Sequence, residues 1–421
     1  MDSTQPGRRA PLQMAFVITL TMDGPYIDGA AVLGHSIRTA HSHFAKDGEP
    51  SPARAEAGEE GTLQPPPYVS SLVALTHPTV SNATRAALAL VGFRVLERPT
   101  PVAIPEIRGS FLRQRIVRSG CCGATELMKL WAWSLVEYDR VLLLDTDSIV
   151  LRPIPLGILL RMAPGDLAYT YDYGMGKRGL RTPPIQGGFL LVRPSPSVLA
   201  ELLEIVREGD FRPGSGWGGS NIGHFWGGVT VQGLLPYYYT VRADRRRVSG
   251  MELDRCVFNN MADNPRGAEY AAALVPLNAS ASGAARDMRW QYVGPDCRAS
   301  TLDAIRSAHF TICSKPWNCR PNRKHALCLA LHARWHSLRA AFVAWRARAP
   351  HGGAADGEGE GAADAAGGTR ESTASAVVAR ACRGGYKPLD LGGSLRYSAA
   401  PQRRLHPRAR SSRAPAKGAM R

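Results

Sequence analysis

Two aspartates, Asp145 and Asp147, directly follow four large aliphatic residues, Val141 to Leu144. Such a run is typical of a strand buried on both faces, as in a parallel sheet covered by helices. Residues two apart in an extended segment point the same way, and ligands of open α/β sheets bind beyond the carboxyl ends of strands. The pair therefore predicts a site for a hard divalent cation that also takes diphosphate oxygens. Two solvated acids in a turn are the alternative, because the tripeptide alone is a weak motif.

A second group with chemical potential lies late in the chain, where His309 precedes Lys315 by six residues beside a short apolar strand. These residues could supply one imidazole ligand and one ammonium group. The alternative interpretation of His309 is a core histidine whose hydrogen bonds are satisfied.

Strands and helices that could position these groups alternate along the chain. The predicted strands are 16–20, 69–75, 93–96, 141–144 and 185–192, and the predicted helices are 29–37, 81–90, 125–137, 194–208, 231–239 and 327–348. This alternation predicts an α/β fold, a doubly wound and mostly parallel sheet with helices on both faces. The helix at 125–137 is expected to bury Trp131, and Lys129 on it has an ordinary surface position as its alternative.

The glycine-rich stretch 214–228 contains Trp217 and Trp226. Glycine permits close approach of the backbone to a ligand, and aromatic faces suit sugar rings. A packed loop with core tryptophans is an equally good interpretation.

Composition divides the 421 residues into one large domain and flanking segments. Residues 1–13 are expected to be disordered, 14–320 to form the domain with a disordered insertion at 46–67, and 321–349 to form an amphipathic helix that packs back on the domain or touches a membrane surface. The segment 350–421 is a low-complexity basic tail. Its charge could hold nucleic acid or an anionic membrane, but a solvated end is the preferred interpretation.

The sequence shows no signal peptide and no transmembrane run, which favours the cytoplasm. Two glycosylation sequons, at Asn82 and Asn278, allow the Golgi instead. The eight cysteines lack paired C-x-x-C spacing, so a zinc site is not expected. Four of them, Cys256, Cys297, Cys313 and Cys319, are close enough in sequence to allow disulfides.

Seven pieces in this order resemble the family 8 glycosyltransferases, the group that includes glycogenin, over about residues 15–320. They are Leu20-Thr-x4-Tyr26, Gly29-Ala-x-Val-Leu-Gly34, Lys129-Leu-x-x-Trp-Ser134, Leu-Asp145-Thr-Asp147, Gly187-Gly-Phe189, Gln232-Gly-Leu-Leu235 and His309-Phe-x4-Lys-Pro-Trp317. Each piece alone is a weak signal, whereas seven in register are a specific one.

The resemblance implies a GT-A fold and retaining transfer of a hexose from a UDP-sugar, with Mn²⁺ or Mg²⁺ as the cofactor. The residues that match the family's metal ligands are Asp145, Asp147 and His309. Those that match the donor site are Leu20, Thr21, Asp23, Tyr26, Lys129, Thr146, Gln186, Gly187, Gly188 and Lys315. Gln232 matches the glutamine below the anomeric carbon, and Lys315 matches the lysine on the departing diphosphate, so both are the expected catalytic residues.

Three departures from the family pattern bear on activity. Val231 stands where the family usually has an aspartate, Gln186 replaces an asparagine, and Ile312 replaces a glycine. The alternative function is therefore a catalytically impaired module that binds a sugar nucleotide or a glycan. The acceptor, a glycan, protein or lipid, and the oligomeric state stay open, and nucleic acid is not an expected partner.

Overall fold

The computed structural model describes residues 11–41, 68–120, 122–175, 181–264, 296–348 and 370–391. The predicted insertion at 46–67, the sequon at Asn278 and most of the segments 1–13 and 350–421 lie outside the described residues. No described helix is both long enough and apolar enough to cross a bilayer.

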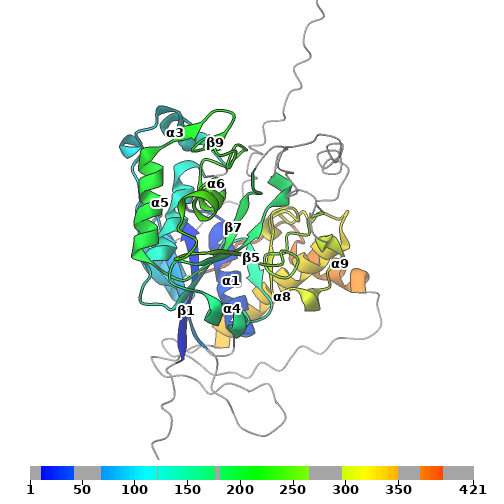
Figure 1. The fold of residues 1–421 in the computed structure, drawn as a ribbon. Coiled ribbons are helices and arrows are strands. Elements are labelled where there is room, and N and C mark those ends of the chain that lie inside the picture. Colours follow the sequence, from blue (N-terminus) through cyan, green and yellow to red (C-terminus); the bar gives the residue numbers. More distant parts are fainter. Residues whose placement is uncertain are drawn as a thin grey trace, which may run out of the picture.

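A seven-stranded sheet forms the centre of the fold, with the strand order β10-β6-β7-β4-β1-β2-β3 (Figure 1). Its strands are β1 (Leu12–Leu20), β2 (Tyr68–Thr76), β3 (Arg94–Glu97), β4 (Arg140–Leu144), β6 (Leu167–Tyr171), β7 (Ile185–Val192) and β10 (Gly250–Glu252). Every neighbouring pair is parallel except the two that β7 forms, with β4 and with β6. The predicted mostly parallel α/β sheet is thus confirmed. The reversal of β7 places its first residues at the same edge as the last residues of β4 and β6.

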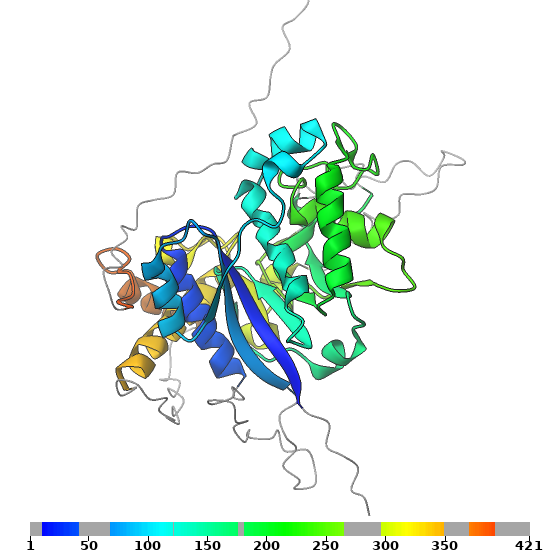
Figure 2. The same ribbon diagram turned by 90° about the vertical axis from the view of Figure 1, so that its left-hand side faces the viewer.

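Successive side chains of the strands point to opposite faces of the sheet and contribute to two separate hydrophobic cores. On β4, for example, Leu143 belongs to one core and Leu142 to the other. The first core packs against α3 (Ser110–Arg115), α5 (Pro196–Glu208), α6 (Val231–Tyr237) and the segment Gly123–Ser134. The second packs against α1 (Tyr26–Ala40), α2 (Asn82–Leu90) and α4 (Leu156–Arg161). Figure 2 shows α1 and α2 in blue on one side of the sheet and α5 in green on the other.

The helix predicted at 125–137 is a 3₁₀ helix, Gly123–Ser134, and the expectation of an α-helix with Trp131 on its buried face is wrong. In this tighter helix Trp133 is fully buried, whereas Trp131 is only half-buried and donates from Nε1 to the Pro99 carbonyl. Three residues per turn move the buried side chains relative to an α-helical pattern. Lys129 is also buried, so its surface interpretation is wrong.

Two small antiparallel sheets complete the strands: β5 (Ser148–Val150) with β11 (Ser307–His309), and β8 (Phe211–Arg212) with β9 (Gly216–Trp217). The second lies in the glycine-rich stretch, where Trp217 is fully buried and donates from Nε1 to the Gly228 carbonyl. A core position is therefore the correct interpretation of Trp217. Trp226 is 45% exposed.

The C-terminal part of the chain packs back on the domain. Helix α8 (Ala326–Arg348) contributes Trp335 and Phe342 to the cores, and α9 (Arg370–Ala381) lies against α8 (Figures 1 and 2). Residues 370–391 thus differ from the expected low-complexity tail. Compositional analysis does not detect them, because their anchors are a disulfide and a few apolar side chains.

Three disulfides connect Cys256 to Cys297, Cys313 to Cys328 and Cys319 to Cys382. Each of the four cysteines expected from sequence separation is in a disulfide. Only the Cys256–Cys297 pair lies within that set, because the folded chain brings the more distant Cys328 and Cys382 next to the other two.

Candidate active site

Asp145 and Asp147 lie where the chain leaves the main sheet after β4 and enters the small sheet at β5. Residues 146 and 147 form a turn, so the expectation that the two aspartates lie in one extended segment is wrong. The change of sheet needs a turn at this point. The two carboxylates nevertheless face one point, where ligand atoms of Asp145, Asp147 and His309 all lie within 4.8 Å of one another.

Backbone pairing brings His309 to the two aspartates. Strand β11 pairs with β5 so that His309 lies opposite Ser148, and the Phe310 amide donates to the Asp147 carbonyl at 2.8 Å. The His309 Nε2 atom is 3.3 Å from Asp147 Oδ1 and 3.7 Å from Asp145 Oδ2. Its buried Nδ1 has no hydrogen-bond partner among the described residues, so the polar contacts of the ring are at Nε2.

Each of the two carboxylates is paired with a lysine. Lys315 contacts Asp147, and Lys129 lies 2.8 Å from Asp145 Oδ1 and 3.0 Å from Glu126. Burial alone would raise the pKa of Asp147, but Lys315 and His309 hold it well below its usual value. Burial alone would lower the pKa of Lys315, but the Asp147 carboxylate raises it above the usual value. The site therefore keeps both charges while buried.

Glycines at the start of β7 make room for these side chains. A Cβ on Gly188 would lie 2.5 Å from His309 Cε1 and 2.8 Å from Asp145 Oδ2, too close for any side chain. A Cβ on Gly187 would lie 3.4 Å from Lys129 Nζ. Gln186 accepts a hydrogen bond from the Gly188 amide, so its side chain holds the backbone rather than projecting into the site.

The residues around this point fit a divalent cation. Two carboxylates and an imidazole form a mixed oxygen and nitrogen donor set that suits Mn²⁺ and also admits Mg²⁺. The space that Gly188 leaves is bordered by two of the three ligands, Asp145 and His309. The two ammonium groups beside them provide additional positive charge for an anionic ligand.

Gln232, at the start of α6, lies beside Gly187, as Lys129 does. Its Cγ would be 3.6 Å from a Cβ on Gly187, and its Nε2 is 3.7 Å from the sulfur of Met175. Val231, next to it, is fully buried in the core. Gln232 is therefore brought to the edge where the two aspartates and Lys129 meet.

Asp172 is a buried acidic residue at the same edge that sequence reasoning missed. It follows β6, a strand that was also not predicted, and accepts a hydrogen bond from the Met175 amide at 3.2 Å. Burial and the neighbouring Asp263 raise the pKa of Asp172 to about 6. The signal in the sequence is Leu-Ala-Tyr-Thr-Tyr before it, a β-branched and aromatic run that ends on an acid.

Four predicted donor-site residues lie between the end of β1 and the start of α1, in two groups. Leu20 is buried at the end of β1, the Thr21 carbonyl accepts from Thr79, and Asp23 accepts from Ser81 at 3.1 Å. The structure thus ties Asp23 to the start of α2 rather than to the metal ligands. Tyr26 packs edge-on against Trp317, two residues after Lys315, with ring centroids 5.6 Å apart.

The backbone carbonyl of Thr146 lies close to Gly29 of α1. A Cβ on Gly29 would lie 2.5 Å from the Thr146 carbonyl oxygen, so glycine lets α1 approach the turn between the two aspartates. Helix α1, the Asp145–Asp147 turn and the Lys315 segment therefore meet at one edge of the sheet.

No family model matches the sequence, and no curated protein matches it. Solved structures to which this chain is similar include a variant of the galactosyltransferase LgtC, at 15% identity and a TM-score of 0.43, over 79% of this chain and 99% of that one. The bifunctional glycosyltransferase WbbM is 14% identical with a TM-score of 0.42, over 80% of this chain and 51% of that one. The glycosyltransferase GlyE of Streptococcus pneumoniae is 14% identical with a TM-score of 0.39, over 79% and 64%. At such values, function has to be inferred from the side chains of the site.

Proposed function

We propose that this chain is a glycosyltransferase that moves a hexose from a UDP-sugar to an acceptor hydroxyl group with a divalent cation, Mn²⁺ or Mg²⁺. The observation that carries the proposal is the convergence of Asp145, Asp147 and His309 beside Lys315. Three ligand groups next to two ammonium groups match the needs of a diphosphate, which presents its oxygens to both kinds of charge.

In the proposed reaction, the bond between the anomeric carbon and the β-phosphate oxygen breaks and the acceptor oxygen bonds to that carbon. A cation bound by Asp145, Asp147 and His309 would supply Lewis-acid stabilisation of the departing diphosphate. Lys315 would donate to the same phosphate as its negative charge grows, without giving up its proton. Lys129, held between Glu126 and Asp145, would keep Asp145 oriented.

Retention of configuration is proposed to follow a front-face course, in which a departing phosphate oxygen accepts the proton of the acceptor hydroxyl. The three side chains nearest to a Cβ on Gly187 are those of Val231, Lys129 and Gln232, and none is a carboxylate. A double displacement would need a nucleophile at that place. The amide oxygen of Gln232 is proposed to lie below the anomeric carbon and stabilise its developing positive charge.

The test is hydrolysis of UDP-sugars in the presence of Mn²⁺. We expect Asp147→Ala to lower the rate at least about 100-fold, since it removes a ligand and the partner of Lys315. Asp303→Ala is the matched control, because Asp303 is a surface acid whose side chain is 82% exposed. Equal hydrolysis by wild type and Asp147→Ala would overturn the proposal.

A binding module is the second candidate function, and the occupation of the region beside Gly187 by Val231 and Gln232 favours it. This candidate predicts that the wild-type chain binds UDP with Mn²⁺ in calorimetry but neither hydrolyses nor transfers any UDP-sugar. A screen of donors with mass spectrometry of the products separates the two candidates.

A further inference from the structure

Residues 370–391, here called the C-terminal latch, complete a buried acidic site in the first turn of α1. Asp28 is fully buried there and accepts hydrogen bonds from the Tyr386 hydroxyl and, at 3.0 Å, from the Leu389 amide. Leu389 and Leu391 are themselves buried in the core that packs against α1. A buried carboxylate requires such partners, so the latch helps to fix the beginning of α1, where Tyr26 lies.

A series of aromatic rings continues from the latch to the candidate donor site. The centroids of Tyr386 and Trp335 are 6.3 Å apart, those of Trp335 and Trp317 are 6.1 Å apart, and Trp317 then packs against Tyr26. Arg339 of α8 lies over the Tyr386 ring at 5.4 Å. The latch is thus connected by continuous ring packing to Trp317, two residues after Lys315.

Two disulfides hold both ends of residues 313–319, here called the Lys315 segment. Cys313, two residues before Lys315, is bonded to Cys328 of α8, and Cys319, four residues after it, is bonded to Cys382 of the latch. The position of the Lys315 backbone therefore depends on the latch as well as on α8.

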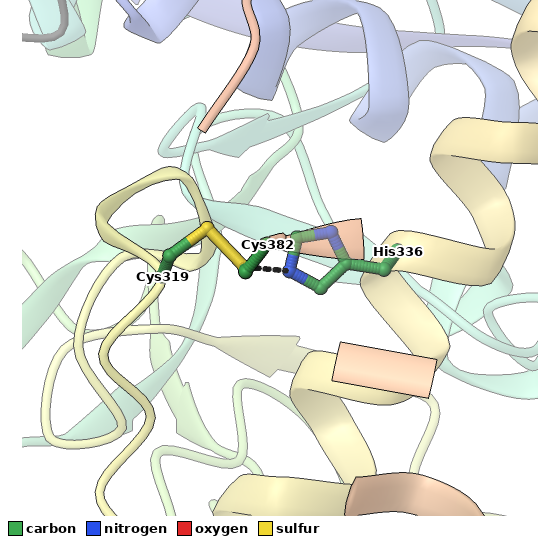
Figure 3. A group of neighbouring side chains, drawn as sticks. All are labelled: Cys319, His336 and Cys382. Atoms are coloured by element: carbon green, nitrogen blue, oxygen red, sulfur yellow. Dashed lines mark hydrogen bonds between the residues drawn. A yellow bond between two sulfur atoms is a disulfide. The ribbon is translucent and has the colours of Figure 1, made fainter. Parts of the chain in front are cut away.

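The three disulfides differ in their access to solvent. Cys313 and Cys328 are fully buried, as is Cys297, and Cys256 is 7% exposed, whereas Cys319 and Cys382 are only half-buried. A reductant therefore reaches the latch disulfide more easily than the other two. His336 points at this disulfide, with Nε2 at 3.7 Å from the sulfur of Cys382 (Figure 3).

Cys319, Cys382 and His336 could also be considered as metal ligands, since their ligand atoms lie within 4.8 Å of one another. The two sulfurs are bonded to each other, however, and only free thiolates bind a metal strongly. A disulfide with a neighbouring imidazole is the better description.

We propose that the C-terminal latch positions Lys315 and Tyr26 for the diphosphate donor, and that the Cys319–Cys382 disulfide makes this positioning sensitive to dithiol reductants. The proposal rests on the proposed function, because it assigns Lys315 to the donor. It adds a regulatory segment to the site that lies outside the residues of the family pattern.

Reduction follows ordinary thiol–disulfide exchange with a dithiol. One thiolate of the reductant attacks the sulfur of Cys319, the S–S bond breaks, and the electron pair leaves on the sulfur of Cys382. The second thiolate of the reductant then attacks the reductant sulfur that is bonded to Cys319. The reductant closes to a disulfide, the thiolate of Cys319 leaves, and the two protons of the dithiol pass to the two cysteines. Burial, together with His332 and Arg339, lowers the pKa of His336 to about 4, so its neutral ring can accept a hydrogen bond from the new Cys382 thiol.

The test compares two variants that each lack one disulfide. Cys319→Ser/Cys382→Ser opens the latch, and Cys256→Ser/Cys297→Ser removes a disulfide away from the Lys315 segment. In calorimetry with Mn²⁺ we expect the latch variant to bind UDP about tenfold more weakly and to lose clearly less affinity for uridine, because Lys315 is assigned to the diphosphate alone. The control variant should bind both as wild type does. Tyr386→Phe, which keeps every cysteine, should weaken UDP binding about threefold.

Amide hydrogen exchange of residues 313–319 provides a readout that needs no ligand. Exchange should be faster in the latch variant, and faster in the wild-type chain after dithiol treatment, than in the control variant. If the wild-type chain binds UDP and the latch variant binds it equally well, the latch proposal is wrong and the proposed function stands. If the wild-type chain binds no UDP, the proposed function fails, and unchanged exchange at 313–319 would reject the latch separately.

Discussion

The Lys315 ammonium donates a hydrogen bond to the Asp147 carboxylate across 168 residues of sequence. The Asp147 side chain is 6% exposed and that of Lys315 is 25% exposed, so the carboxylate is the more deeply buried partner. Breaking one partner of such a pair leaves an uncompensated charge, which costs more than the pair itself contributes. The pairing therefore couples the stability of the metal-free chain to the proposed binding of the diphosphate.

Lys315→Ala should affect stability and nucleotide binding together. We expect the free energy of unfolding to fall by roughly 3 kcal/mol in the metal-free chain, because the buried Asp147 loses its main counter-charge. With Mn²⁺ present, the affinity for UDP should fall at least about tenfold, whereas the affinity for uridine should change little.

Chemical denaturation and calorimetry measure the two quantities, and Lys324→Ala, at an exposed lysine, is the control. If both lysine variants unfold at the same denaturant concentration, the ion pair does not contribute to stability as described.

Gly188→Ala should weaken cation binding without unfolding the chain. The added Cβ would lie 2.5 Å from His309 and 2.8 Å from Asp145, so two of the three ligands must move. We expect Mn²⁺ affinity, measured by electron paramagnetic resonance, to fall at least about tenfold, as ligand sets are sensitive to small displacements.

Gly157→Ala in α4 is the control, because a Cβ there has no neighbour within 4 Å and alanine favours a helix. A Gly188→Ala chain that binds Mn²⁺ as tightly as wild type would show that the cation does not bind at this point.

Local patterns in the sequence were enough to predict the end of β4 before Asp145 and the start of β7 at Ile185, because buried apolar runs mark them directly. The same holds for the helix predicted at 81–90, because α2 spans Asn82–Leu90 and Ser81 caps it by accepting from the Thr84 amide. Asp172 escaped prediction because its relevance depends on the position of β6 beside β7.

Other features depend on contacts between distant parts of the chain. The pairing of β5 with β11, which aligns His309 with Ser148, leaves no periodic signal in either short strand. Cys382 and Tyr386 lie in a region whose composition suggests disorder, and their contacts are with residues 63 and 358 positions away. Only the folded chain reveals such partners.

The three disulfides should be present in the isolated protein. Peptide mapping under non-reducing conditions is expected to find Cys256–Cys297, Cys313–Cys328 and Cys319–Cys382 as linked peptides. Stable disulfides of this kind form in oxidising compartments, so this result would favour a secretory compartment over the cytoplasm. Full alkylation of these cysteines without prior reduction would contradict the pairing and would again favour the cytoplasm.

The free energy of unfolding should fall with acidification between about pH 6.5 and pH 4. His336 is 4% exposed, and burial, then His332 and Arg339, lower its pKa from 6.5 to about 4. In this window the unfolded chain binds a proton that the folded chain does not, so stability is fully present above pH 6.5 and falls by up to about 3 kcal/mol as pH approaches 4. Asp172 acts oppositely, because its raised pKa of about 6 means that stability is lost as pH rises.

The two contributions are separated by variants and denaturation curves at several pH values. His336→Gln should reduce the dependence of unfolding free energy on pH between 4 and 6.5, because one titrating group is gone, while His35, whose pKa burial also lowers to about 4, and His332 keep their contributions. Asp172→Asn should make it steeper, because the opposing contribution is removed. If the His336→Gln chain has the wild-type slope, the His336 imidazole is protonated equally in the folded and unfolded states. The proposal that His336 is neutral beside Cys382 would then be wrong.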